Sequence, residues 1–221
     1  MNKEAIKMHM DEIIRLTFNR LDAAYRNQEV ISNTKFEKGG SRLVFPSYYK
    51  NLKSTETRIS EQELRFIFVE VFNAYCDRNK LDLYYSVETP TRDTYKNFAN
   101  SKEDPERADD GRSAEFDLVI FDEQKKRRCL VEFKAKNASE HDHKKDFVKL
   151  NNSNEADNDV LCYFIEVIKS YDKSTINSLS GKIEENLGNV LFYCYALEGE
   201  SKRIGKDKTK GEDISVQITK Q

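Results

Sequence analysis

Two segments with the side-chain pattern of β-strands, 114–122 and 128–136, are separated by a short run of mostly charged residues. Parallel strands need a crossover of about a dozen residues or more, whereas antiparallel strands can be joined by a tight turn. The spacing therefore predicts an antiparallel hairpin. Side chains alternate between the two faces of a strand, and both segments carry apolar residues on both faces, which is typical of strands in a protein interior.

Segments of helical and strand periodicity surround this hairpin along the chain. Apolar residues that recur every three or four positions predict helices, and short apolar or alternating runs predict strands. We expect helices over 3–27, 60–77, 140–152 and 174–188, further strands over 82–88, 160–168, 189–197 and 213–219, and loops over 31–58, 89–113 and 202–210.

The composition is that of a globular protein with a densely charged surface, since 38% of the 221 residues are hydrophobic and 34% are charged. A chain of this length forms one large domain or two small ones. Lys and Arg number 37 against 39 Asp and Glu, so the overall charge indicates no partner. Any nucleic-acid site would have to be a local patch.

The four cysteines lie singly in apolar segments without the spacing of a metal site or a disulfide framework. They predict small core residues in a reducing compartment. The N-terminal segment is charged and lacks the apolar core of a signal peptide, and the apolar stretches are too short to cross a bilayer. We therefore expect a cytoplasmic protein with no membrane partner.

The hairpin contains three charged residues within its apolar runs: Asp117, Glu132 and Lys134. A turn of two or four residues pairs Val119 with Leu130 and Asp117 with Glu132, with opposed Cβ atoms about 4.5–5.5 Å apart. A three-residue turn would move one carboxylate to the opposite face. The even turn therefore predicts two carboxylates on one face, with Lys134 beside them.

Two opposed carboxylates repel each other, and burying them unpaired costs several kcal/mol per ion. Mg²⁺ resolves this conflict because it binds one or two protein carboxylates and keeps several waters. Its free positions can accept a phosphate oxygen and a nucleophilic water. Lys134 can orient that water or stabilise charge on the phosphate. The alternative for Glu132 and Lys134 is a solvated ion pair on an edge strand.

The order Asp117, fourteen residues, then Glu132-Phe133-Lys134 resembles the motif of the PD-(D/E)XK nuclease superfamily. The resemblance covers about 60–168 and implies an α/β, restriction-endonuclease-like fold with a central mixed β-sheet flanked by helices. We expect a single domain over 1–221, with 1–58 as an N-terminal helical extension and 60–168 as the αβββαβ core. Phe116 replaces the Pro of the motif, which removes no ligand.

The resemblance also implies a function and a set of roles. The chain is expected to be a Mg²⁺-dependent nuclease that hydrolyses phosphodiester bonds of nucleic acid, with DNA as the expected substrate and Mn²⁺ able to substitute. Asp117, Glu132 and the backbone carbonyl of Phe133 become metal ligands, and Lys134 becomes the catalytic lysine. Members often dimerise to cut both strands, so a homodimer is a further expectation.

The superfamily often adds a metal-binding Glu from the helix before the strands, and Glu63 is the candidate here. Its alternative role is local, because Ser60-Glu61-Gln62-Glu63 is a capping box. We place capping ahead of metal binding for Glu63. Glu70 lies two turns further along the same helix and is a weaker candidate.

Three lysines are candidates for contact with nucleic-acid phosphates: Lys136, Lys145 and Lys149. For Lys145 and Lys149 we place a solvated helix face ahead of phosphate contact, whereas strand alternation places Lys136 on the same face as Lys134. The run His141-Asp142-His143 lacks the further ligands of a zinc site and predicts the polar start of a helix. The basic turn over 125–128 is suited to phosphate contact or to simple solvation.

Two other functional classes remain compatible with the sequence. One is a non-catalytic nucleic-acid- or protein-binding module with the same fold. The other is a structural or interaction protein in which the charged residues form a surface network. Cleavage, metal-binding and DNA-binding assays separate the three classes.

Overall fold

The computed structural model describes residues 1–30, 43, 45, 58–100, 102–170, 172–198, 204–207 and 212–214. It divides into two compact units, one formed by Met1–Ile6 with Asp82–Gln221 and the other by Lys7–Leu81. The expected core over 60–168 is therefore shared between them, since its first helix belongs to the second unit and its strands to the first.

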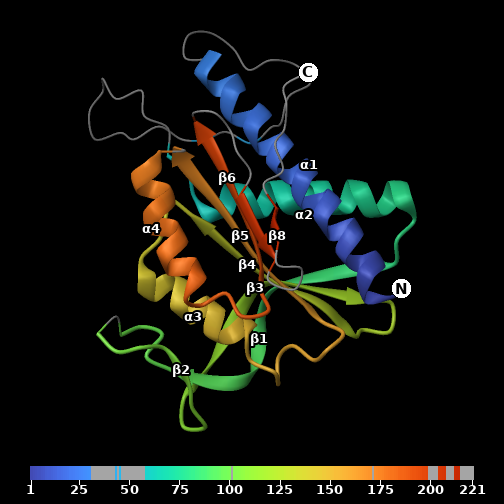
Figure 1. The fold of residues 1–221 in the computed structure, drawn as a ribbon. Helices are drawn as coiled ribbons and strands as arrows, with labels where there is room; N and C mark the ends of the chain where they lie inside the picture. Colours follow the sequence, from blue (N-terminus) through green and yellow to red (C-terminus); the bar gives the residue numbers. More distant parts are fainter. Residues whose placement is uncertain are drawn as a thin grey trace. The chain divides into compact units, whose positions relative to one another are not determined.

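The unit Lys7–Leu81 contains most of helix α1 (Lys3–Val30) and all of helix α2 (Glu61–Asn79). His9 Nδ1 lies 3.0 Å from the Tyr75 hydroxyl, so the start of α1 lies beside the end of α2 (Figure 1). The apolar residues that predicted the first helix are all buried: Ile14, Phe18, Leu21 and Tyr25. Each helix in the described ranges is too short or too polar to cross a bilayer.

The other unit contains a mixed β-sheet in the order β2-β1-β3-β4-β5-β6-β7-β8 (Figure 1). Strand β4 pairs antiparallel with β3 and parallel with β5. The strands are β1 (Leu83–Lys96), β2 (Glu106–Arg107), β3 (Arg112–Asp122), β4 (Arg127–Ala135), β5 (Leu161–Ser170), β6 (Leu191–Glu198), β7 (Ile204–Asp207) and β8 (Glu212–Ile214).

Helices connect the parallel strands, as a parallel crossover requires. Helix α3 (Glu140–Leu150) joins β4 to β5, and α4 (Lys173–Glu184) joins β5 to β6. Both pack on the same face of the sheet (Figure 1), where their apolar residues complete one core. That core includes Phe147, Leu150, Leu179 and Ile183 from the helices and Val119, Leu130, Phe164 and Phe192 from the strands. The predicted α/β class, a mixed sheet flanked by helices, is confirmed.

The β3–β4 hairpin has the predicted register in its strands, but its turn differs in length from the predicted turn. Val119 pairs with Leu130, as expected, whereas Phe121 pairs with Arg127 near the turn. The latter pair centres the turn on Gln124, and a turn of odd length would by itself reverse the face of one strand. A β-bulge at Arg128 inserts one more residue and restores the alignment.

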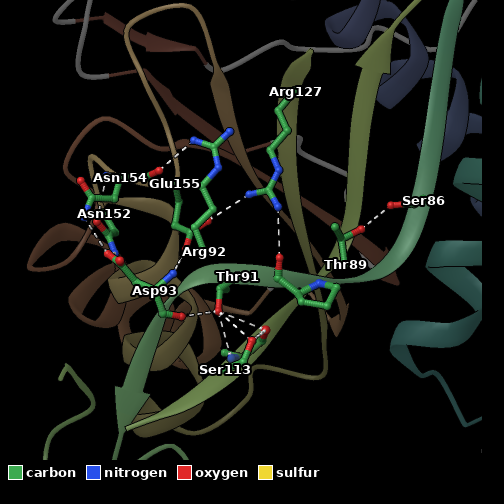
Figure 2. A network of polar contacts seen from close by, with 12 residues as sticks. Ser86, Thr89, Thr91, Arg92, Asp93, Ser113, Arg127, Asn152, Asn154 and Glu155 are labelled. Atoms are coloured by element: carbon green, nitrogen blue, oxygen red, sulfur yellow. Dashed lines mark hydrogen bonds and ion pairs between the residues drawn. The ribbon is translucent and has the colours of Figure 1, made fainter. Parts of the chain in front are cut away.

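The polar stretch 89–113, expected to be a loop, is partly strand. Strand β1 continues through it to Lys96, with a shift in register between Pro90 and Thr94. Thr91 supports this irregular segment, because its hydroxyl accepts the Ala114 N–H at 3.0 Å and donates to the Asp93 carbonyl at 2.7 Å (Figure 2). Side-chain hydrogen bonds therefore replace ladder bonds where the pairing shifts.

A second group of polar contacts ties this part of β1 to the loop after α3 (Figure 2). The buried Glu155 carboxylate accepts the Asp93 N–H at 2.8 Å and lies 3.0 Å from the Arg127 guanidinium. The amides of Asn152 and Asn154 both donate to the Asp93 carboxylate, at 2.7 and 3.0 Å. These contacts fix the end of α3 relative to β1 and β4.

Other boundaries differ from those predicted. Helix α4 ends at Glu184, four residues before Gly188, and the basic loop over 202–210 contains β7. Strand β7 forms because it pairs with β6, and no local pattern in the sequence indicates this pairing.

The predicted loop 31–58 and the end of the predicted strand 213–219 lie almost wholly outside the described residues. The four cysteines are buried and free, as expected.

Candidate functional site

The hairpin brings Asp117 and Glu132 to neighbouring positions on β3 and β4. The β3–β4 ladder ends at the pair Leu118–Val131, and Asp117 and Glu132 are the next residues along the two strands. The Asp117 carboxylate also accepts the backbone N–H of Phe133 at 2.7 Å. This bond fixes the Asp117 side chain against the strand that carries Glu132.

Glu132 is buried, with 2% of its surface exposed. Its carboxylate lies 2.6 Å from the Lys149 ammonium of helix α3. Burial raises the pKa of Glu132 well above its usual range, the Lys149 charge opposes this, and the nearby charges of Asp146 and Asp117 add to it. Glu132 is therefore a carboxylate that needs positive charge nearby in order to stay ionised.

Lys134 points to the same side of β4 and is also buried. Its ammonium lies 2.6 Å from the Asp146 carboxylate and donates to the Phe133 carbonyl at 3.4 Å. The lysine expected to be catalytic is thus held by two oxygens, one from the helix and one from its own strand.

Asp146 and Lys149 lie one turn apart on α3, and both are almost entirely buried. Lys149 contacts Asp146 at 3.0 Å and donates to the Glu115 carbonyl at 2.8 Å. Burial opposes ionisation of Asp146, but the Lys149 and Lys134 charges outweigh it and lower its pKa. Burial acts to lower the pKa of Lys149, but the Glu132 and Asp146 carboxylates outweigh burial and raise this pKa above its usual value.

Together these side chains form what we call the β4–α3 ion cluster: Asp117, Glu132, Lys134, Asp146 and Lys149. Within it, the buried Glu132 and Asp146 carboxylates face the Lys134 and Lys149 ammonium groups. Buried charge of one sign is costly unless it is compensated. Lys134 and Lys149 therefore compensate the two buried carboxylates, and the half-buried Asp117 adds a third carboxylate near Glu132.

A second buried pair lies beside the cluster. His143, one turn before Asp146 on α3, places Nε2 3.0 Å from the Glu166 carboxylate of β5 and Nδ1 2.9 Å from the Ser139 carbonyl. A carbonyl only accepts hydrogen bonds, so Nδ1 carries a hydrogen. Both ring nitrogens of His143 thus have hydrogen-bond partners. His143 is therefore part of a closed pair, and His141 bonds to the Asn97 carbonyl at 2.9 Å.

Glu63, the candidate metal ligand from the helix before the strands, lies in the unit Lys7–Leu81. It is buried, its carboxylate accepts the Ser60 hydroxyl, and it lies 3.6 Å from the Arg58 guanidinium. Ser60 is the N-cap of α2, but its side chain accepts no backbone N–H. The predicted capping box is therefore not formed, and the Ser60 and Glu63 side chains bond each other instead. Glu70 is exposed and lies 3.2 Å from Arg20.

The candidate phosphate-binding lysines have three different environments. Lys136 is exposed and follows the end of β4, where its φ of 72° interrupts the alternation that would align it with Lys134. Lys145 lies 3.0 Å from Asp142 on the surface of α3. Lys149 is buried in the ion cluster.

The basic turn is largely engaged in contacts within its own unit. Lys126 lies 2.8 Å from Asp159, and Arg128 donates to the Met1 carbonyl at 2.9 Å. Arg127 contacts Glu155 in the network described above. These contacts neutralise much of the charge that suggested phosphate binding.

The expected metal ligands have suitable chemistry for Mg²⁺. The Asp117 and Glu132 carboxylates and the Phe133 carbonyl are the hard oxygen donors that this ion prefers, and it needs only one or two protein carboxylates. Glu132 Oε1 has an ion-pair partner but no hydrogen bond of good geometry. Among the described residues, no three His, Cys, Asp or Glu side chains are grouped to hold a metal. The two carboxylates and the carbonyl would leave the remaining coordination positions of Mg²⁺ to waters.

Three further parts of this region were not predicted from the sequence: Asp146, the Glu115 carbonyl and the His143–Glu166 pair. A signal for the helix residues was present, since His143, Asp146 and Lys149 follow one another at three-residue intervals. That spacing puts them on one face of a helix, next to the apolar Phe147 and Leu150. A polar stripe beside an apolar one indicates buried polar partners on the facing strand.

No family model matches the chain, and searches of curated proteins and of solved structures found no match either.

Proposed function

We propose that the protein is a divalent-metal-dependent nuclease with a restriction-endonuclease-like fold, which hydrolyses phosphodiester bonds of nucleic acid, with DNA as the expected substrate. One observation carries the proposal. Asp117 and Glu132 directly follow the last pair of the β3–β4 ladder, Leu118–Val131, and the Asp117 charge acts on Glu132. Lys134 follows Glu132 two residues later on β4. Two carboxylates and a lysine so placed are the groups that metal-assisted phosphodiester hydrolysis requires.

Asp117, Glu132 and the Phe133 carbonyl would hold Mg²⁺, or Mn²⁺ in its place. The bound ion would polarise a phosphate oxygen and supply an activated water. The protein's own contribution is positioning and charge. The Phe133 N–H holds Asp117, and Asp146 holds the Lys134 ammonium 2.6 Å away, where it is available to stabilise charge on the reacting phosphate.

A second candidate function is supported by the closure of the ion cluster. Lys149 contacts Glu132, and Asp146 contacts Lys134, so two of the expected catalytic side chains, Glu132 and Lys134, already have oppositely charged neighbours. Such a cluster is also compatible with a non-catalytic module that binds nucleic acid or protein through the same fold.

The test is cleavage of supercoiled plasmid, linear duplex, single-stranded DNA and RNA, each with Mg²⁺, Mn²⁺ or EDTA. We expect metal-dependent cleavage that falls about 100-fold or more in Asp117→Asn, Glu132→Gln and Lys134→Met. Lys144→Met is the control, because Lys144 lies on α3 but pairs with Glu140 and Asp104 at the surface.

Cleavage that survives Asp117→Asn and Lys134→Met would refute the assignment. Binding of nucleic acid without cleavage, unchanged by EDTA, would favour the second candidate.

A further inference from the structure

The Lys149 ammonium of the ion cluster is held by several contacts at once. It lies 2.6 Å from Glu132, 3.0 Å from Asp146 and 2.8 Å from the Glu115 carbonyl. It also lies over the Phe116 ring, 5.6 Å from its centroid. These partners are carboxylate and carbonyl oxygens with a π-face, which are the groups that stabilise a cation.

A divalent ion and this ammonium would need the same carboxylate. Mg²⁺ binds oxygen at about 2.1 Å, and the ammonium already lies 2.6 Å from Glu132 Oε1. Two cations on one carboxylate would lie within about 5 Å of each other, where like charges repel strongly in a buried site. Simultaneous occupation is therefore unfavourable.

We propose that the Lys149 ammonium is a built-in cation that competes with the divalent ion for Glu132, so that Lys149 sets the metal affinity of the site. This inference rests on the proposed function, because it takes the metal site as given. It adds a regulatory element: without metal, Lys149 compensates Glu132, and metal binding requires Lys149 to withdraw.

Asp146 provides the place to which Lys149 withdraws. It contacts Lys149 and Lys134 with different oxygens, Oδ1 and Oδ2. Lys149 can leave Glu132 by side-chain rotation and still keep Asp146 as a partner, so release does not require α3 to move. Asp146 is thus a positioning residue for both lysines.

The first test measures metal binding directly, without an activity readout. Mn²⁺ is titrated calorimetrically into the full chain at pH 8.5, which limits protonation of carboxylates, for wild type, Lys149→Met and Lys144→Met. We expect Lys149→Met to bind Mn²⁺ at least about tenfold more tightly than wild type, because removing a like charge favours the ion. Lys144→Met, which keeps the buried cluster intact, should bind as wild type does.

The second test uses wild-type protein and so does not depend on folding of a variant. Lysines are acetylated with an N-hydroxysuccinimide ester, with and without saturating Mn²⁺, and quantified by peptide mass spectrometry. Lys149 is 5% exposed and should be protected without metal. Release from Glu132 removes the shortest contact of the Lys149 ammonium. Its labelling should therefore rise several-fold when metal is bound, although it keeps Asp146 as a partner, while labelling of Lys144 stays constant.

The outcomes separate this inference from the nuclease proposal. If wild type binds Mn²⁺ but Lys149→Met binds no more tightly, or if Lys149 stays protected in metal-saturated protein, competition is contradicted and the nuclease proposal stands. If no variant binds Mn²⁺, both are contradicted. Tighter binding by Lys149→Met in a protein that cleaves no nucleic acid supports competition and contradicts the nuclease.

Discussion

The Lys134 ammonium lies 2.6 Å from the Asp146 carboxylate, and only 8% and 2% of the two side chains are exposed. A charged pair that is this well buried depends on both partners, since removal of either leaves a buried charge without compensation. Helix α3 and strand β4 are therefore linked by charge as well as by the apolar core. This link gives the first prediction.

Asp146→Asn should lower the free energy of unfolding by about 3–5 kcal/mol, because Lys134 and Lys149 lose a shared carboxylate. Urea unfolding followed by circular dichroism measures the change. Asp104→Asn is the matched control, because Asp104 also pairs with a lysine, Lys144, but its side chain is 81% exposed. The effect of Asp104→Asn on the free energy of unfolding should stay within about 0.5 kcal/mol. Equal effects of the two substitutions would contradict the structural role of Asp146.

Glu155→Gln should destabilise the network that joins β1 to the loop after α3 (Figure 2). The neutral amide weakens the contacts with Arg127 and with the Asp93 N–H, at a cost of about 1.5–3 kcal/mol. Hydrogen exchange at the Asp93 amide should accelerate along with the loss of stability. Glu123→Gln, at an exposed position of the hairpin turn, should change neither quantity, and unchanged exchange at Asp93 in Glu155→Gln would argue against the network.

The glycines Gly188 and Gly181 should respond in opposite directions to replacement by alanine. Gly188 has a φ of +53°, and an added Cβ would lie 2.1 Å from the Asn151 side-chain oxygen. Asn151 cannot move away easily because it bonds the Asn186 carbonyl and the Asn189 N–H. Gly188→Ala should therefore cost at least about 2 kcal/mol of unfolding free energy.

Gly181 supplies the control, since an added Cβ there has nothing within 4 Å. Gly181→Ala lies within α4 and should raise stability by about 0.5–1 kcal/mol through helix propensity. Chemical denaturation of both variants checks the pair, and a neutral Gly188→Ala would show that the αL position tolerates a side chain.

The Asp172 cap of helix α4 should make part of the stability depend on pH. The Ser174 hydroxyl and the Thr175 N–H and hydroxyl lower the pKa of Asp172 from 3.8 to about 2. A lowered folded-state pKa gives stability that is complete above the unfolded value and is lost as the pH falls towards 2. Asp172→Ala should therefore lower the thermal midpoint at pH 7, and the difference from wild type should shrink between pH 4 and pH 2. A constant difference over that range would contradict the assigned cap.

The pairing of β3 with β4 shows how far the sequence determines this fold. The apolar runs predicted the strands, and an assumed turn of even length predicted the Val119–Leu130 register, which the structure has. A slip of one residue would move every side chain of one strand to the opposite face. The odd turn centred on Gln124 and the compensating bulge at Arg128 could not be foreseen. An even turn and an odd turn followed by a bulge give the same pairing of the buried residues. Burial of the side chains therefore cannot decide between these two turns, and the local sequence does not decide between them either.

The sequence predicted the charged site residues of the two strands but not the buried role of those on helix α3. Asp117, Glu132 and Lys134 are conspicuous because they interrupt apolar strands. Asp146 lies in a charged helix segment, where an acidic residue has no distinguishing pattern, and only the approach of α3 to β4 gives it two lysine partners. Lys149 was considered as a surface lysine, and its burial likewise depends on packing between elements far apart in sequence.

The most direct test of the central claim is a crystal structure of the protein soaked in Mn²⁺, with anomalous diffraction recorded to locate the ion. The account predicts an anomalous peak about 2.1 Å from carboxylate oxygens of Asp117 and Glu132, with Lys149 turned away from Glu132 towards Asp146. A crystal saturated with Mn²⁺ that shows no peak there, with Lys149 still against Glu132, would contradict the account.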